Sequence, residues 1–312
     1  MSTMHLLFRS QIGGPMTRHE FGGTWTDEKL ERVRKYLAAY TTIFAKNERA
    51  RKLTTIYVDA FAGTGYRTPA PRNREQAPLF PELTEPDAKD FLKGSARIAL
   101  EVKPPFKHYV FVDKNPVRIR ELERLRADFP EKAANVEIVP ADANGYLLNW
   151  CQKMIDWRLS RAVVFLDPYG MEAEWGVIEA LARTKAVDLW ILFPLGQAVN
   201  RLLTKSEMPP EYWAQALTRI FGTDGWKDAF YSRKTQLTLF EGERSVQVKQ
   251  TDFGKISQFF VERLKSVFTA VAENPLPLFN SKNNPLFLLC FASGNPTGSA
   301  IAIRIAQHIL RQ

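Results

Sequence analysis

The chain contains the segment Ile56-Tyr57-Val58-Asp59-Ala60-Phe61-Ala62-Gly63-Thr64-Gly65, in which an apolar run passes through one acid into a glycine turn. β-Branched and aromatic residues without polar alternation are typical of a strand buried on both faces of a parallel sheet. Gly63 and Gly65 carry no side chains, so the backbone amides of the turn are open to a ligand. The segment therefore predicts a doubly wound α/β sheet that binds a nucleotide-like cofactor at the carboxyl end of its first strand.

An acid at the end of the second predicted strand, 108–112, supports a cofactor site. Asp113 follows Gly65 by 48 residues, but 28 of these, 66–93, form a Pro-rich insertion, and without it the offset is 20 residues. About 20 residues is the spacing at which such an acid meets ribose hydroxyls. We therefore interpret Asp113 as a ribose ligand; the alternative is a strand-end acid that only caps a helix. Thr68 stands where a nicotinamide enzyme would have its third glycine, which argues against that class.

The third predicted strand, 136–139, leads to a second acid, Asp142. At this position a carboxylate can read the amino group of an adenine. Asp142 can equally serve as the cap of the helix predicted over 145–154.

The fourth predicted strand, 162–166, leads into Asp167-Pro168-Tyr169-Gly170. A carboxylate and a carbonyl at such a strand end can accept hydrogen bonds from an amino group, while an aromatic ring stacks on a planar substrate. We predict Asp167, Pro168 and Tyr169 as the catalytic residues that hold the reacting amino group of such a substrate. The alternative is a purely structural turn stabilised by the Asp-Pro pair.

The composition sets the class of protein and its surroundings. The chain has 312 residues, of which 45% are hydrophobic and 25% are charged, and its formal net charge is +9. The basic balance favours a polyanionic partner, such as a nucleic acid or a nucleotide-bearing substrate. With only Cys151 and Cys290, we expect neither a disulfide framework nor a metal site. No apolar stretch is long enough for a bilayer span, and residues 1–12 are too polar for a secretory signal, so we expect a cytoplasmic protein without membrane contact.

The remaining segments predict how the chain is divided. We expect an arm and helix over 1–53, with Thr26 as the helix cap, a cofactor-binding core over 54–196, an inserted helical and aromatic-rich subdomain over 197–263, and a completing segment over 264–312. In the core, Ser95 is predicted to cap a helix, and 187–193 is the fifth strand. In the last segment, strands over 267–272 and 286–293 form an antiparallel hairpin on the sheet edge, and a helix over 297–310 closes the chain.

This layout resembles that of class I S-adenosylmethionine-dependent methyltransferases, which implies a Rossmann-like, mostly parallel sheet with a C-terminal antiparallel hairpin. More closely, Glu20–Trp25, the 59–65 turn, Gly94-Ser95-Ala96, 167–170 and Leu192-Phe193-Pro194-Leu195-Gly196 resemble the three-Cys-motif partner proteins over nearly the whole chain. That resemblance implies a partner protein with a three-cysteine motif. The single proline of 167–170 is similar to the Asp-Pro-Phe-Gly of tRNA guanine-N2 methyltransferases and differs from the Asp-Pro-Pro-Tyr of amino-directed DNA methyltransferases.

The resemblance implies S-adenosylmethionine as cofactor and assigns three groups of residues to it. These are Asp59, Phe61, Gly63, Thr64 and Gly65 for the methionine turn, Asp113 and Lys114 for the ribose, and Asp142 and Ala143 for the adenine. An acceptor pocket is predicted from Trp25, Arg67, Phe193 and Pro194.

The sequence thus predicts a methyltransferase that acts on a nitrogen of a nucleobase-containing substrate. Two alternatives stay open. One is a methyltransferase for the oxygen or carboxyl of a small molecule or peptide, for which the charge of +9 is incidental. The other is a non-catalytic cofactor-binding partner of a three-cysteine-motif protein, against which the intact 167–170 motif argues.

Overall fold

The computed structural model describes residues 24–62, 94–168, 170–205, 207–238, 242–280 and 282–312. Their organising element is one eight-stranded sheet, in the order β3-β2-β1-β4-β5-β10-β8, with β9 also paired to β10. The first five strands are parallel, and β10 runs antiparallel to β5. The strands are β1 (Thr54–Ala60), β2 (His108–Asp113), β3 (Val136–Pro140), β4 (Ser160–Leu166), β5 (Val187–Phe193), β8 (Ala270–Val271), β9 (Leu276–Phe279) and β10 (Pro285–Ser293).

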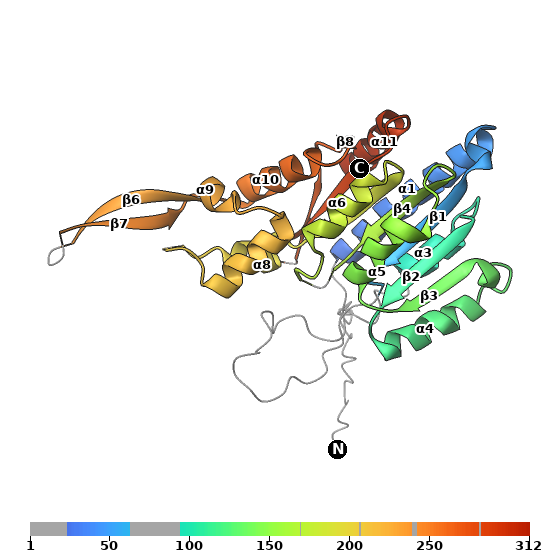
Figure 1. Cartoon of the computed structure of the whole chain (residues 1–312), viewed down its shortest axis with the longest axis horizontal. Helices are drawn as coiled ribbons and strands as arrows, with labels where there is room; N and C mark the ends of the chain where they lie inside the picture. The colour runs from blue at the N-terminus through green and yellow to red at the C-terminus, as the bar shows by residue number, and fades with distance from the viewer. Residues whose placement is uncertain (1–23, 63–93, 169, 206, 239–241, 281) are drawn as a thin grey trace, which may run out of the picture.

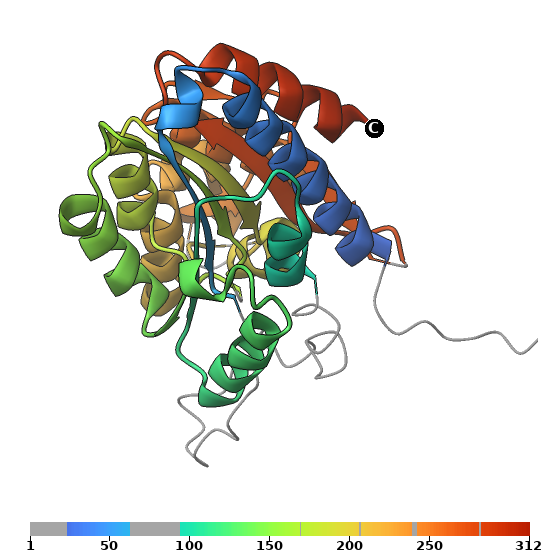
Figure 2. The same ribbon diagram turned by 90° about the vertical axis from the view of Figure 1, so that its right-hand side faces the viewer.

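Helices cover both faces of this sheet, as expected for a doubly wound fold (Figure 2). The longest is α1, which runs beside α11 on one face. The helices are α1 (Thr24–Lys46), α3 (Ser95–Glu101), α4 (Pro116–Ala127), α5 (Ala143–Asn149), α6 (Trp175–Arg183), α7 (Asn200–Leu202), α8 (Glu211–Phe221), α9 (Trp226–Phe230), α10 (Phe253–Lys265) and α11 (Ser299–Arg311). No helix in the described ranges is both long enough and apolar enough to cross a membrane.

The period-two alternation of each strand divides the apolar residues between two cores. Ile56 and Val58 of β1 point to the core that α5, α6, α8, α9 and α10 cover. Tyr57 points to the opposite core, under α1, α3 and α11. Because both faces are covered, nearly all of β1 is buried, which accounts for its lack of polar alternation.

The predicted doubly wound architecture is confirmed, with the five parallel strands close to their predicted bounds. Two of the predicted helix caps are wrong. Thr26 is not a cap, because α1 already includes Thr24. Ser95 is the first residue of α3, after Gly94, and its side chain bonds to Asp59 instead of capping the helix.

The C-terminal antiparallel strands are also confirmed, but their arrangement differs from a simple hairpin at the edge. The longer strand, β10, lies inside the sheet between β5 and the edge. The edge itself consists of two short pieces, β8 and β9, separated by a segment that contains Pro275. Proline lacks a backbone donor, so Pro275 and Pro277 are tolerated at an edge but interrupt a regular strand.

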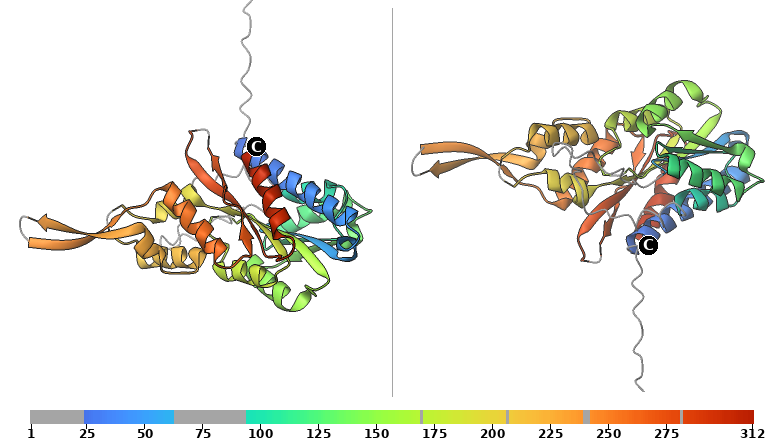
Figure 3. Two further views of the ribbon diagram at one scale, coloured as in Figure 1. Left: turned by 90° about the horizontal axis from the view of Figure 1, so that it is seen from above. Right: turned by 90° about the horizontal axis from the view of Figure 1, so that it is seen from below.

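The region after β5 contains helices and a hairpin, of which the sequence patterns did not predict the hairpin. Helices α8, α9 and α10 bury residues in the same core as β5 and α6. Strands β6 (Tyr231–Thr238) and β7 (Gly242–Lys249) pair with each other as a separate two-stranded sheet. This hairpin extends away from the rest of the protein (Figures 1 and 3). The domain division at 197 and 263 stays a prediction.

Candidate cofactor and acceptor site

Three acids lie at the carboxyl ends of neighbouring strands. Strand β1 is flanked by β2 and β4, with Ala60 opposite both Val112 and Leu166. Asp59 is near the end of β1, Asp113 ends β2, and Asp167 directly follows β4. The strand ends therefore bring the predicted methionine, ribose and acceptor acids to one edge of the sheet.

The side chain of Asp167 forms a buried ion pair with Lys29 of α1. Lys29 Nζ lies 2.8 Å from Asp167 Oδ2, and the two side chains are 0% and 7% exposed. The ammonium is also 5.9 Å from the centre of the Phe165 ring. Burial lowers the pKa of Lys29 and raises the pKa of Asp167, and their mutual attraction opposes both shifts. The predicted acceptor carboxylate is thus held by a cation 138 residues away in the chain.

Asp59 belongs to the same cluster. It is 1% exposed and accepts hydrogen bonds from Ser95 and from the Tyr57 hydroxyl, the latter at 3.4 Å. Burial, reinforced by the charge of Asp167, raises the pKa of Asp59 to about 7, while the bonds from Ser95 and Tyr57 and the charge of Lys29 oppose the rise. This carboxyl can therefore take up or release a proton near neutral pH.

Asp113 is 7% exposed, and Asn115 N donates a 2.6 Å hydrogen bond to its Oδ1. Burial raises its pKa, opposed by the Asn115 bond and by the charge of Arg118. The raised pKa means that these partners do not fully offset the cost of burying the carboxylate, a deficit that hydroxyl donors can fill. The neighbouring Lys114 forms an exposed ion pair with Glu172, at 3.2 Å.

Asp142 caps a helix, as one of its two sequence interpretations predicted. Its Oδ2 accepts a 2.9 Å hydrogen bond from Gly145 N at the start of α5. Ala143 is buried at the first position of that helix. Asn144 joins α5 to the loop before α6, because its amide donates to Glu172 O at 2.8 Å and accepts from Glu174 N at 3.1 Å.

The backbone after β1 turns sharply. Phe61 has φ +64, a left-handed conformation that glycine adopts freely and that costs a bulky residue about 1–3 kcal/mol. Gly170, after the predicted catalytic segment, also has a positive φ of +64. Gly63, Thr64, Gly65, Arg67 and Tyr169 lie outside the described residues, and of Trp25 only the helical backbone is described.

Pro168, Phe193 and Pro194 are buried. The Phe193 ring is 0% exposed and stacks on Phe260 with the ring centres 3.9 Å apart. Phe193 is therefore a core residue in this structure, and its side chain has no exposed surface with which to line the predicted acceptor pocket.

The sequence interpretation missed Lys29 and Tyr57. A signal for Lys29 was present, since it precedes Val33 by four positions on the apolar face of α1, where a lysine is unexpected. Tyr57 was recognised only as part of a buried strand. Side chains two positions apart on a strand point to the same face of the sheet, so the hydrogen bond from Tyr57 to Asp59 follows from their spacing along β1.

No protein-family model matches the chain, and no curated protein matches it. Solved structures that resemble it include a Legionella pneumophila protein, with 14% identity, 79% of this chain and 94% of that chain covered, and a TM-score of 0.37. Spermidine synthase from Thermotoga maritima has 10% identity, coverage of 88% and 60%, and a TM-score of 0.37. Magnesium protoporphyrin IX methyltransferase from Synechocystis PCC 6803, solved with bound S-adenosylmethionine, has 12% identity, coverage of 76% and 87%, and a TM-score of 0.28. The fold assignment rests on the order and direction of the strands in this chain, a doubly wound α/β sheet with one antiparallel strand inserted beside β5.

Proposed function

We propose that the protein is an S-adenosylmethionine-dependent methyltransferase. The observation that carries this proposal is the set of buried acids at the carboxyl ends of β1 and β2, in a sheet whose antiparallel β10 follows β5. Ligands of open α/β sheets bind outside the carboxyl ends of the strands. When bound, the cofactor supplies a sulfonium methyl group.

The described residues fit such a cofactor at two points. Asp113 combines burial with a raised pKa, so two ribose hydroxyls would complete its hydrogen bonding. The left-handed conformation of Phe61 turns the backbone at the end of β1, where the methionine part of the cofactor would bind. We assign the methionine part to Asp59, Phe61 and the 63–65 turn, the ribose to Asp113 and Lys114, and the adenine to Asp142 and Ala143.

The acceptor we propose is a nitrogen of a nucleobase-containing substrate. Asp167 Oδ and the Pro168 carbonyl would accept hydrogen bonds from the amino group, and Tyr169 would stack on the base. Lys29 acts here as a positioning residue, because its ion pair holds the Asp167 carboxylate at the strand end. The acceptor pocket would be completed by Trp25, Arg67 and Pro194.

One observation supports a second candidate, a non-catalytic cofactor-binding partner of a three-cysteine-motif protein. Lys29 already neutralises Asp167 within the protein, so that carboxylate has a structural role that needs no acceptor. The two candidates share a cofactor and differ in turnover.

Calorimetry with S-adenosylmethionine tests the cofactor. We expect Asp113→Ala to weaken binding by about 1–3 kcal/mol, since it leaves ribose hydroxyls unpaired. Asp128→Ala is the matched control, an exposed acid paired to Arg97 at 2.5 Å on the protein surface. Binding of NADH with no response to S-adenosylmethionine would overturn the proposal.

Transfer of labelled methyl groups to RNA, DNA, nucleotide and metabolite pools tests the acceptor. We expect Asp167→Asn to lower turnover about 10²-fold while cofactor affinity changes by less than about 1 kcal/mol. If loss of the charge destabilises the fold, the pair variant Lys29→Met with Asp167→Asn removes both charges and keeps the test valid. Cofactor binding without transfer to any pool would favour the non-catalytic candidate.

A further experiment addresses the polyanionic substrate. The charge of +9 supports a phosphate-bearing partner, whose binding should weaken steeply between about 50 and 200 mM salt through counterion release. Transfer to an uncharged acceptor with no dependence on salt would favour the small-molecule alternative.

A further inference from the structure

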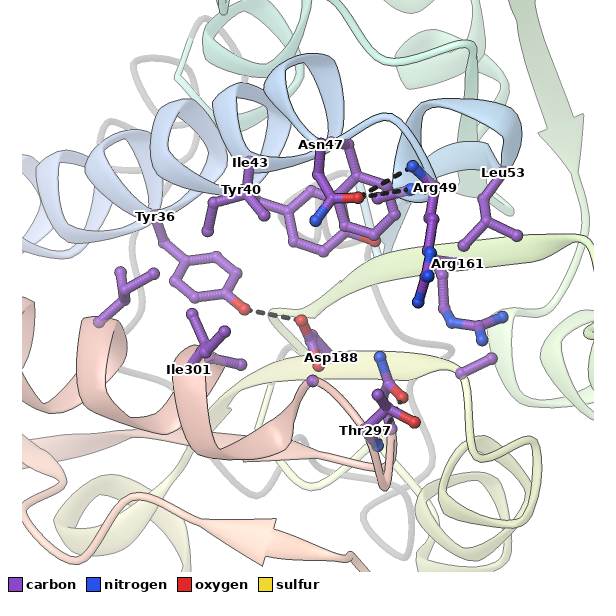
Figure 4. Close-up of a pocket in the computed structure, with 17 residues that line it drawn as sticks. Tyr36, Tyr40, Ile43, Asn47, Arg49, Leu53, Arg161, Asp188, Thr297 and Ile301 are labelled. Atoms are coloured by element: carbon purple, nitrogen blue, oxygen red, sulfur yellow. Dashed lines mark hydrogen bonds between the residues drawn. The ribbon is translucent and has the colours of Figure 1, made fainter.

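A cavity of about 440 Å³ lies at the opposite edge of the sheet from Asp59, Asp113 and Asp167. It is bordered by residues at the amino ends of β4 and β5, by the second half of α1 and by the first turns of α11 (Figure 4). The proposed methyl-transfer site uses none of its residues. Its volume is in the range of small-molecule sites.

Most of its wall is apolar. The lining includes Ile43 and Phe44 of α1, Ile301 and Ile305 of α11, and Leu53. Ile43 and Ile301 are 36% and 46% exposed, which is high for large aliphatic side chains at the rim of a cavity. The apolar part of a ligand would therefore fit against this wall.

One polar group in the wall is left without a partner. Tyr40 is 7% exposed, and its hydroxyl is buried with no hydrogen-bond partner in the described part of the chain. An unpaired buried hydroxyl costs about 1–3 kcal/mol. A ligand in the cavity can supply the missing bond.

The end of the cavity formed by Asp188, Arg161 and Arg49 carries more positive than negative charge. Both carboxylate oxygens of Asp188 already have a donor within the protein, because Tyr36 donates to Oδ2 at 2.7 Å and Ser293 to Oδ1 at 2.6 Å. Arg161 and Arg49 line the same wall, and Figure 4 draws both on one side of Asp188. Arg161 is held in place by the carbonyls of Trp157 and Ser160, at 2.9 and 2.7 Å.

The start of α11 adds to this positive end. Asn295, Thr297 and Gly298 line the cavity immediately before the 13-residue helix, which has no acid in its first turn. A helix N-terminus carries a partial positive charge. The carboxyl of Asp188, in contrast, already accepts two hydroxyl donors, which offset part of its attraction for an amine.

We infer that this cavity binds a small monocarboxylic acid with an aromatic or branched apolar body. The carboxylate accepts hydrogen bonds from the Tyr40 hydroxyl and the Arg161 guanidinium, and the body packs between the isoleucines of α1 and α11. A phosphate would find fewer hydrogen-bond donors than it needs, because the polar end offers few donors and the rest of the wall is apolar. The inference does not depend on the proposed methyl transfer.

Three probes with one apolar body test this inference by calorimetry on the full chain: 2-naphthoate, 2-naphthalenemethanol and 2-naphthylmethylamine. We expect the carboxylate to bind at least tenfold more tightly than the alcohol, and the amine to bind least. Equal affinities would reduce the cavity to an apolar hole, and preference for the amine would assign recognition to Asp188; either result overturns the inference.

Two variants locate the carboxylate. Tyr40→Phe removes only the unpartnered hydroxyl, so it should fold as the wild type and bind 2-naphthoate about fivefold more weakly. Arg161→Gln should abolish the preference for the carboxylate over the alcohol, while Arg183→Gln, an exposed arginine of α6, should preserve it. Wild-type affinity for 2-naphthoate in the well-folded Tyr40→Phe variant would contradict the assignment.

Discussion

At the scale of single residues, the pair Lys29–Asp167 couples the first helix to the carboxyl edge of the sheet. Both side chains are almost completely buried, so each charge relies on the other. Removing one member of such a pair costs about 3–5 kcal/mol, because the remaining charge is left buried without compensation. We expect Lys29→Met to lower the free energy of unfolding by about 3 kcal/mol at pH 8, measured with urea.

The control for this variant lies on the same helix. Lys35 is 36% exposed and 3.8 Å from Glu31, and Lys35→Met should change the free energy by less than about 0.5 kcal/mol. The combination of Lys29→Met with Asp167→Asn should recover much of the loss. A Lys29→Met protein as stable as the wild type would mean that the pair contributes little to the fold.

The buried carboxyl of Asp59 predicts a specific dependence of stability on pH. Its pKa is about 7 in the folded protein, against about 3.8 in the unfolded chain. Between about pH 4 and 7 the folded state therefore holds a proton that the unfolded state has lost, so stability falls as the pH rises through this window. Above about pH 7 both states are ionised, and the full penalty for the buried charge remains.

Asp59→Asn removes this titration. We expect its free energy of unfolding to decline less between pH 5 and 8 than that of the wild type, by a few kcal/mol at about 1.4 kcal/mol per pKa unit. The exposed Asp128→Asn should keep the wild-type dependence. Asp188, whose pKa burial raises to about 6, titrates in all three proteins, so some dependence on pH should persist. Parallel curves for Asp59→Asn and the wild type would contradict a folded-state pKa near 7.

At the scale of elements, the end of α8 depends on a glycine. Gly222 has φ +67, and a Cβ at this position would lie 2.0 Å from Trp175 Cδ1 of α6. Both the left-handed backbone and the close approach of α6 exclude a side chain. We expect Gly222→Ala to destabilise the protein by more than about 2 kcal/mol, measured by urea unfolding.

A second glycine provides the matched comparison. Gly176 is exposed in α6, and a Cβ there would meet nothing within 4 Å. Gly176→Ala should stabilise the protein by about 0.5–1 kcal/mol, because alanine loses less backbone entropy in a helix. Equal effects of the two changes would show that the contact with Trp175 does not limit the position.

Helix α1 is the element that joins the two ends of the sheet. Its first turns carry Lys29 to Asp167, and its later turns carry Tyr36 to Asp188. The same helix therefore borders both the edge that we propose for methyl transfer and the cavity that we propose for a carboxylic acid. Thermal unfolding monitored at both ends should report one transition, because one rigid element connects them.

At the scale of the whole molecule, the β6–β7 hairpin is the part that stands apart from the sheet (Figure 1). Arg233 of β6 is paired with Gln247 of β7, so residues 234–246 can be replaced by Asn-Gly, a favoured two-residue turn. In the described part of the chain, the strands of this outer part of the hairpin, within residues 234–246, pair only with each other. We expect the shortened protein to unfold within about 0.5 kcal/mol of the wild type and to bind S-adenosylmethionine equally well.

The base of the hairpin is the part that must be retained. Lys249 Nζ donates to Asn200 Oδ1 at 2.7 Å, and Glu207 N donates to Gln247 O at 2.8 Å. These contacts join the hairpin to the segment after β5. Loss of cooperative unfolding in the shortened protein would mean that the outer hairpin contributes to the main core.

The sequence by itself determined the parallel strands and the acids that follow them. Continuous apolar runs such as 56–58 are recognisable because a parallel sheet is buried on both faces. Asp59, Asp113 and Asp167 were found because an acid at the end of such a run interrupts the apolar pattern, and the ends of parallel strands meet at one edge. The antiparallel C-terminal strands followed from the absence of a helix between them.

Only the tertiary structure decided which groups these acids contact. Lys29 is 138 residues from Asp167, and the apolar periodicity of α1 predicts a buried face without specifying what that face covers. The insertion of β10 inside the sheet, the pairing of β6 with β7 and the cavity beside Tyr40 likewise arise from contacts between distant segments. Local patterns record the burial of a residue and its secondary structure, whereas the partner of a buried charge or hydroxyl is set by how the elements pack.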